Sequence, residues 1–292
     1  MPPGRLCEGP VWDPDTEMLL WVDIRSGDIH SATLASFDGT LDLVDQSTMR
    51  LDGPVSAVLP CTSGALLATV GDRIVRIAGR TATPVATLPM PDDGVRRRTN
   101  DAKVDPAGRL LAGTMSEDGV KGSAALYRLD PDGSLTTLRH GVTISNGLGW
   151  SPDGATLYYA DSPTRRVDAF EYDTATGTFG PGRPFAAFFD GEPDGLTVDA
   201  NGWVWVAVWG AGEVRAFDPS GHPRAVVEVG PSQVSSCTFA GPRLDVLVIT
   251  TAAEDEAATE PDAGRLFTCK PGTVGLPVTP YADTRLVHAD GS

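Results

Sequence analysis

The chain is poor in basic residues and has no long apolar run. Its 292 residues include 23 Lys and Arg against 39 Asp and Glu, a formal net charge of −16. So acidic a protein is a poor partner for nucleic acid or an anionic membrane surface. No stretch approaches the roughly 20 apolar residues of a membrane-spanning helix, and the N-terminal MPPGRLCEGP lacks the apolar core of a secretion signal. We expect a cytoplasmic protein without nucleic-acid or membrane partners.

The sequence patterns of disulfide, zinc and serine-nucleophile sites are also missing. The four cysteines form no CxxC pair and have no histidine at zinc-site spacing, so we expect them to be buried apolar side chains. No GxSxG motif occurs, and the four histidines lie in dissimilar contexts without an evident catalytic partner. A hydrolase built on this chain would need a route other than Ser–His chemistry.

Long helical periodicity is absent, and 33 Gly and 24 Pro are spread evenly between short apolar runs. A turn followed by an apolar strand recurs six times with a period of about 45 residues, the length of a propeller blade. The repeats are WDPDTEMLLWVDI from Trp12, PCTSGALLATV from Pro60, VDPAGRLLAGTM from Val104, WSPDGATLYYADS from Trp150, VDANGWVWVAVWG from Val198 and FAGPRLDVLVITT from Phe239. The sequence predicts an all-β fold: a single domain over residues 1–292, a six-bladed β-propeller with four-stranded antiparallel blades around a central channel.

Four oxygen-bearing side chains recur five residues before the turn of their repeat. They are Glu8, Asn100, Asn146 and Asp194. The innermost strand of every propeller blade lines the central channel, so equivalent positions form a ring around one of its mouths. Near this position the other two repeats carry serines, which are weaker ligands: Ser56, and Ser235 or Ser236. The pattern predicts that the four stronger oxygen donors converge on the axis.

Two carboxylates and two amides at one narrow mouth need a countercharge, because burying ionised groups unpaired is costly. Oxygen-only ligation favours a hard divalent ion such as Ca²⁺, Mg²⁺ or Mn²⁺, although carboxylates also accept Zn²⁺ and Fe²⁺. The alternative is that each side chain only caps its local turn. Four positions in register, one of them the weak turn former Glu8, favour the cation. For Asp101, in contrast, we prefer a local cap.

A basic triplet, Arg96, Arg97 and Arg98, precedes Asn100. A solvated loop is a sufficient explanation for the first two. Arg98 lies two residues before Asn100, and the fork geometry of a guanidinium suits ligand oxygens. Two acidic residues, Glu117 and Asp118, follow the GTMS segment, and either could accept hydrogen bonds from ligand hydroxyls.

Five segments in order resemble the regucalcin/gluconolactonase family of sugar lactonases, also called senescence marker protein-like. They are EGPVW at 8–12, RTNDAKVDPAGRLLAGTM at 98–115, SNGLGWSPD at 145–153, PDGLTVDANGWVWVA at 193–207 and SSCTFAG at 235–241. The resemblance implies a propeller that holds one divalent metal ion through the residues matching Glu8, Asn146 and Asp194. It also implies that Arg98 and Asn100 bind substrate oxygens, assisted by an acidic residue after GTM. Asp118 aligns best there, although relatives usually have Glu.

The activity implied by the resemblance is hydrolysis of a sugar-derived lactone, such as gluconolactone, xylonolactone or arabinonolactone, to the aldonic acid. A Lewis acid that polarises the carbonyl and lowers the pKa of bound water supplies most of what this reaction needs. The expected cofactor is one divalent ion (Ca, Zn, Mn, Mg or Fe(II)), and Asp194 is the predicted catalytic base as well as a ligand. The expected partner is a small-molecule sugar lactone, and the protein a monomer or weak homo-oligomer.

Two other functions are compatible with a propeller. A non-catalytic calcium- or sugar-binding propeller would use the same cation, but it would not call for Arg98 and Asn100 as a substrate clamp beside it. A protein-interaction scaffold is disfavoured, because it has no need of acidic residues that converge on the axis.

Two segments are less regular. Only seven residues precede Glu8, where relatives usually carry an extra strand, so either residues 275–283 (GLPVTPYAD) close the ring or part of the natural N-terminus is missing. Residues 252–264 (AAEDEAATEPDAG) are acidic and of low complexity, and we expect a solvated loop inside the sixth blade.

Overall fold

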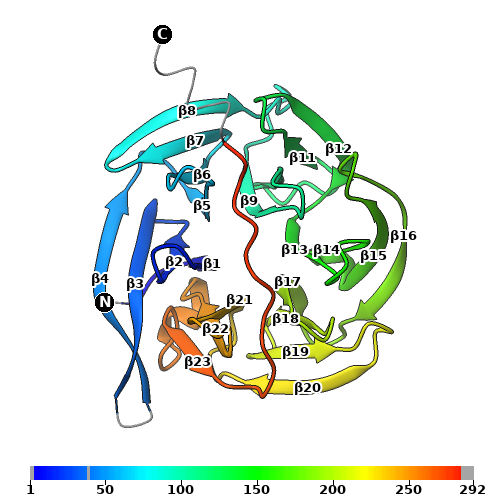
Figure 1. Cartoon of the computed structure of the whole chain (residues 1–292). Helices are drawn as coiled ribbons and strands as arrows, with labels where there is room; N and C mark the ends of the chain where they lie inside the picture. The colour runs from blue at the N-terminus through cyan, green and yellow to red at the C-terminus, as the bar shows by residue number, and fades with distance from the viewer. Residues whose placement is uncertain (1–2, 38–39, 284–292) are drawn as a thin grey trace.

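A computed structural model describes residues 3–37 and 40–283 of the chain. Six antiparallel sheets stand around a central axis, and the first strand of each lies nearest that axis (Figure 1). The predicted six-bladed β-propeller is confirmed. Helix in this part of the chain is limited to two short 3-10 segments, η1 (Ser162–Thr164) and η2 (Asp255–Thr259). None of the described helices is long and apolar enough to cross a membrane.

The first three blades are regular meanders of four strands. The first contains β1 (Cys7–Asp13), β2 (Met18–Asp23), β3 (Asp28–Phe37) and β4 (Thr40–Arg50). The second contains β5 (Val55–Pro60), β6 (Leu66–Val70), β7 (Arg73–Ala78) and β8 (Thr81–Thr87). The third contains β9 (Arg97–Val104), β10 (Leu110–Ser116), β11 (Ala124–Leu129) and β12 (Leu135–Val142).

The remaining blades follow the same order with one exception. The fourth contains β13 (Ser145–Trp150), β14 (Thr156–Asp161), β15 (Arg166–Asp173) and β16 (Thr178–Ala187). The fifth contains β17 (Glu192–Val198), β18 (Val204–Trp209), β19 (Glu213–Phe217) and β20 (Pro223–Glu228). The sixth contains β21 (Val234–Ala240), β22 (Val246–Thr251) and β23 (Leu266–Cys269). Within the described residues the sixth sheet has three strands, one fewer than predicted.

The hydrophobic core lies between the faces of neighbouring blades. Leu67 and Ile74 of the second blade, for example, pack in one buried cluster with Leu110 and Tyr127 of the third. A blade between two others is covered on both faces, so its inner strands are buried throughout, as in β5. This packing holds the inner strands rigidly around the axis, where a site built from several blades needs them.

The ring closes where β1 packs beside β21. The N-terminal segment continues this contact, because Leu6 pairs with Ala252 and the Gly4 N–H donates to Gly264 O at 2.8 Å. Residues 275–283, which we call the C-terminal strap, run instead across the end of the channel (Figure 1). The explanation in which this segment closes the ring is therefore wrong.

Candidate metal and substrate site

Every innermost strand has an irregular register close to its first residues. The shifts fall between Glu8 and Val11, Val55 and Ala57, Asn146 and Leu148, Pro193 and Leu196, Val234 and Ser236, and on β9 opposite Ala112 and Thr114. A bulge leaves a residue unpaired and re-aims its side chain. Six bulges at one level explain how polar side chains on different blades can all turn toward the same mouth of the channel.

Glycine follows each of the three predicted metal ligands, and it permits close approach of the strands there. A Cβ added to Gly147 would lie 2.4 Å from Asp194 O, and one added to Gly195 would lie 2.1 Å from Ser236 Oγ. Gly9, after Glu8, has a positive φ of 52°, which disfavours other residues. The innermost strands of the fourth, fifth and sixth blades therefore approach closely beside the ligand positions.

The predicted ligands Glu8, Asn146 and Asp194 are buried, with 7%, 5% and 5% of their surface exposed. The pKa of Glu8 is raised well above its ordinary value by burial and then by the negative charges of Asp194 and Asp101. The pKa of Asp194 is raised by burial and then by Asp101, against hydrogen bonds from the Gly195 N–H and the Asn146 side chain. The structure therefore brings these side chains from three different blades together.

The set has the chemistry of a cation site. Asp194 Oδ1 is buried and has no hydrogen-bond partner. Asn146 donates its Nδ2 to Ser162 Oγ at 3.0 Å, and Ser162 Oγ donates to Pro193 O at 2.7 Å, which fixes the orientation of the amide. Two close carboxylates and an amide oxygen suit a hard divalent ion, which would remove their repulsion. The residues present fit the metal that the resemblance implies.

The candidate cation site does not consist of His, Cys, Asp and Glu side chains alone. In residues 3–37 and 40–283, no group of three or more such side chains could hold a metal ion. The candidate set has two carboxylates and takes its third donor from an amide. Asn146, which sequence spacing predicts, is thus essential to the proposed ligation.

The predicted substrate residues Arg98 and Asn100 lie next to this set. Arg98 donates from Nη1 to Thr99 O and to Asn100 Oδ1, both at 2.9 Å, and Asn100 donates from Nδ2 to Ser145 O at 3.0 Å. Arg98 is 4% exposed, and its Nε has no hydrogen-bond partner. Burial and then the nearby charge of Arg25 lower the pKa of Arg98 to about 10. A buried guanidinium with a free donor is suited to bind a ligand oxygen.

The two acidic residues after the GTMS segment have different surroundings. Asp118 accepts from the Arg96 backbone N–H at 2.9 Å and from Arg96 Nη2 at 2.7 Å. Glu117 instead has its Oε1 4.0 Å from Arg98 Nε, and its side chain is 30% exposed. Arg96 Nη1 also lies 3.5 Å from Glu117 Oε2, so Arg96 pairs with both acidic residues. Of the two, Glu117 is the one that lies beside Arg98, whereas the predicted substrate contact Asp118 is held by Arg96.

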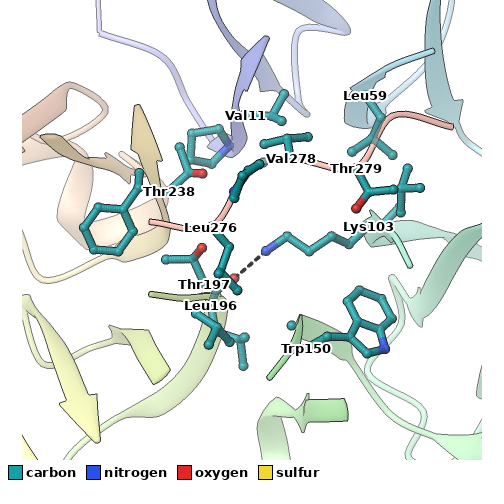
Figure 2. A pocket seen from close by; sticks show the side chains of 18 of the residues that line it. Val11, Leu59, Lys103, Trp150, Leu196, Thr197, Thr238, Leu276, Val278 and Thr279 are labelled. Carbon is teal, nitrogen blue, oxygen red and sulfur yellow. Dashed lines mark hydrogen bonds between the residues drawn. The ribbon is translucent and has the colours of Figure 1, made fainter. Parts of the chain in front are cut away.

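Asp101 and Lys103, which lie on β9, add charge inside the channel. Asp101 Oδ1 accepts from the Ala102 N–H at 2.7 Å, so it acts as a local cap, but its charge also acts on both Glu8 and Asp194. Burial raises the pKa of Asp101 to about 6, against the effect of Lys103. Lys103 Nζ donates to Leu196 O at 2.8 Å, reaching from the third blade to the fifth (Figure 2). Sequence analysis overlooked this lysine, although a basic residue on an inner strand was a signal for it.

Lys103 also borders a cavity of about 320 Å³ within the channel. Leu59, Leu196 and Trp150 contribute to its wall, and Leu276 and Val278 of the strap line it as well (Figure 2). The strap therefore narrows the end of the channel remote from the ligand set. Substrate would reach the candidate site from the mouth where the six bulges lie.

The serines and cysteines predicted to be weak ligands or structural residues are engaged in the fold. Ser56 donates to Thr99 Oγ1 at 2.8 Å in the next blade, and Ser235 donates to Cys7 O at 2.6 Å across the ring closure. All four cysteines are free; Cys7, Cys61 and Cys237 are buried as expected, whereas Cys269 is only half-buried. The second and sixth blades thus use their serine position to join neighbouring blades.

Comparison with known proteins gives the family. Residues 6–253 match the family described as the SMP-30/Gluconolactonase/LRE-like region. The chain belongs to this family. It is 35% identical to the pentonolactonase XacC of Haloferax volcanii, over 94% of this chain and 93% of the relative, and 34% identical to human regucalcin, over 90% of both. The solved structure of a calcium-binding protein, regucalcin, from Agrobacterium tumefaciens is 29% identical, with a TM-score of 0.86 over 96% of this chain and 94% of that one. The family resemblance seen in the motifs is confirmed.

Proposed function

We propose that this chain hydrolyses a sugar-derived lactone to the aldonic acid and uses one divalent metal ion. The family and the name of its pentonolactonase relative support the reaction class. One observation carries the proposal: two buried polar atoms at the same mouth of the channel, Asp194 Oδ1 and Arg98 Nε, have no hydrogen-bond partner. The first suits a cation, and the second suits a substrate oxygen.

Glu8, Asn146 and Asp194 would hold the metal ion. When bound, it would polarise the lactone carbonyl and lower the pKa of bound water. Ser162 keeps the Asn146 amide in place, and Gly147 and Gly195 allow the strands to bring the ligands together. Calcium, zinc, manganese, magnesium and iron(II) all accept this set of oxygen donors.

Arg98 would bind and orient the lactone. Its Nη1 is already used to hold Asn100, so its free Nε faces an acceptor on the substrate. Glu117, close to Arg98 Nε, would accept a hydrogen bond from a ring hydroxyl. We therefore assign Glu117 the role that sequence alignment gives to Asp118, which would instead anchor the strand through Arg96.

Asp194 would act as the base. Water attacks the lactone carbonyl carbon while Asp194 takes one of its protons. The ring C–O bond then breaks, and the proton passes from Asp194 to the ring oxygen, which leaves as a hydroxyl group. The products are the hydroxy acid and an unchanged enzyme, and no serine or cysteine nucleophile is needed.

One experiment tests this function. The metal-stripped protein is reconstituted separately with Ca²⁺, Mg²⁺, Mn²⁺, Zn²⁺ or Fe²⁺, and acid release is measured with gluconolactone, xylonolactone and arabinonolactone. We expect turnover of at least one lactone with at least one ion, and none after chelation. Tight metal uptake without turnover by any ion would overturn the proposal and favour a non-catalytic calcium- or sugar-binding propeller.

A further inference from the structure

A second arginine and a second glutamate lie at the same mouth as Arg98 and Glu117. Arg25 follows β2, whose last residue Asp23 pairs with Cys7 at the start of β1, so Arg25 emerges at the same end of the blade as Glu8. Glu254 follows β22, whose end pairs with the start of β21 at the same level. Arg25 Nε donates to Glu254 Oε1, and its Nη2 lies 3.2 Å from Oε2. This ion pair joins the first and sixth blades at the ring closure.

The segment that carries Glu254 has exposed residues such as Asp255 and Asp262, as expected of a solvated loop, but Glu254 itself is held in place. Gln233 accepts from the Glu254 N–H at 2.9 Å and donates to Glu254 O at 3.1 Å. Further along, Glu260 accepts from Ser232 Oγ at 2.7 Å, and Ala257 is 4% exposed. The backbone thus presents the Glu254 carboxylate in a fixed position.

The pair remains accessible to a ligand. The Arg25 side chain is 39% exposed and that of Glu254 is 17% exposed. Arg25 is close enough to Arg98 for its charge to be the second cause of the lowered pKa of Arg98, and the charge of Glu117 likewise acts on Arg25. The strand pairing places the two Arg–Glu pairs at the same end of the blades, one on the third blade and one at the junction of the first and sixth.

We propose that Arg25 and Glu254 form a second clamp, which binds hydroxyl groups on the part of the lactone that points away from Arg98. This inference rests on the proposed lactonase function and deepens it. A hydroxyl group both donates and accepts, and a guanidinium beside a carboxylate offers N–H donors and acceptor oxygens side by side. The two pairs together are neutral, and their carboxylates repel an anionic group. The substrate class selected is a neutral, polyhydroxylated lactone with an exocyclic hydroxyl-bearing arm.

The clamp is tested by substrate selectivity. D-Ribono-1,4-lactone and D-erythrono-1,4-lactone differ in one exocyclic hydroxymethyl group, and γ-butyrolactone lacks all hydroxyls. In Arg25→Gln and Glu254→Gln we expect the ratio of kcat/KM for ribonolactone to that for γ-butyrolactone to fall by about tenfold or more, with KM changing more than kcat. The control is Arg243→Gln, which removes an Arg–Asp pair that is more exposed than Arg25–Glu254 from a turn at the other end of the blades and should leave the ratio unchanged.

Three outcomes would contradict the clamp proposal or show that the lactonase proposal beneath it is wrong. An unchanged ratio in both variants means that the pair does not contact substrate. An equal loss on all three lactones, accompanied by a lower melting temperature, means that the pair only braces the junction between blades. Absence of turnover in the wild type means that the proposed function is wrong; binding of ribonolactone measured by ligand-detected NMR then still tests whether Arg25→Gln weakens the clamp.

Discussion

Single residues at the mouth of this propeller carry polar atoms that the protein itself leaves unpaired. Asp194 Oδ1 and Arg98 Nε are both buried without a hydrogen-bond partner. Such atoms cost free energy, since neither water nor a protein group solvates them. In the function we propose, a cation bound beside Glu8 would satisfy Asp194 Oδ1, and a substrate oxygen would satisfy Arg98 Nε.

The first prediction concerns Asp194. Asp194→Asn keeps the size of the side chain but removes its negative charge, so we expect kcat for lactone hydrolysis to fall by about 10²-fold to 10⁴-fold. The metal-free variant should be at least as stable as the wild type, because a buried unpaired charge is lost. Asp190→Asn is the control, because Asp190 lies in the loop just before β17, is exposed, and pairs with Arg215. Full turnover with bound metal in Asp194→Asn would remove Asp194 as the base.

A second prediction concerns Ser162, which orients the predicted metal ligand Asn146. Ser162→Ala removes the acceptor for Asn146 Nδ2 and the donor to Pro193 O. We expect metal affinity, measured by calorimetry, to fall by about tenfold to a hundredfold, with a loss of about 1 kcal/mol in the free energy of unfolding. Thr251→Val is the control, because it deletes a buried hydroxyl bond to Arg265 O without touching a ligand. Equal affinity losses in the two variants would contradict the positioning role.

Among the structural elements, the bulged inner strands determine the geometry of the site. On β1, β13 and β17 the bulge lies next to the predicted metal ligand, and Gly follows that residue. The approach of β13 to β17 at Gly147 leaves no room for a side chain. Distances between the ligands therefore depend on backbone packing as much as on the ligands themselves.

Gly147→Ala tests this dependence. The added Cβ would lie 2.4 Å from Asp194 O, so β13 or β17 must move. We expect a loss of about 1–3 kcal/mol in unfolding free energy together with a large loss of metal affinity. Gly180→Ala on the outer strand β16 is the control, because an added Cβ there meets nothing within 4 Å. Equal stability of the two variants in chemical denaturation would show that the close approach is not restrictive.

For the whole molecule, the C-terminal strap connects blades that are not neighbours in the ring. Its residue Gly275 pairs with Asp199 of the fifth blade, and Ala282 donates to Gly108 O of the third at 3.0 Å. At the end of the strap Asp283, which is fully buried, accepts from Arg76 Nε at 2.9 Å and from the Ser63 N–H at 3.0 Å. The strap therefore braces the ring as well as narrowing the channel.

Asp283→Ala tests this brace. The substitution leaves the largely buried Arg76 without its partner, so we expect a loss of about 3–5 kcal/mol in unfolding free energy at neutral pH. Asp245→Ala, which breaks a pair with the exposed Arg243, should cost less than about 1 kcal/mol. Similar losses in the two variants would mean that the strap contributes little to the ring.

The same pair predicts a pH dependence. Burial alone would raise the pKa of Asp283, but hydrogen bonds from Ser63 and Arg76 outweigh it and lower the pKa. A lowered pKa stabilises the fold above the pKa of the unfolded chain, about 4, and this contribution disappears as the pH falls through the folded value. The difference between Asp283→Ala and the wild type should therefore shrink below pH 4 in denaturant titrations. A constant difference down to pH 3 would contradict the assignment.

Much of the fold could be predicted because it repeats locally. Turn residues such as Asp105 and Asp199 accept hydrogen bonds from nearby backbone N–H groups in the structure, as a turn signal implies. The path of residues 275–283 and the anchoring of Glu254 could not be predicted in this way. Both depend on contacts with parts of the chain that are distant in sequence, and no local pattern encodes those contacts.

Some features of the candidate site could likewise be predicted from local sequence, and others could not. The order of repeats, the residue type at each mouth position and the glycine after each ligand are properties of the sequence alone, because a period and a backbone preference are local. The tertiary structure alone decided that Glu117 rather than Asp118 lies beside Arg98, that Lys103 reaches across the channel, and that Arg25 meets Glu254 where the ring closes. One physical reason is that adjacent residues on a strand such as β9 point in opposite directions, and only the closed ring determines which of them faces the axis. Glu117, Arg25 and Glu254 lie beyond the ends of their strands, where contacts with distant parts of the chain decide their positions.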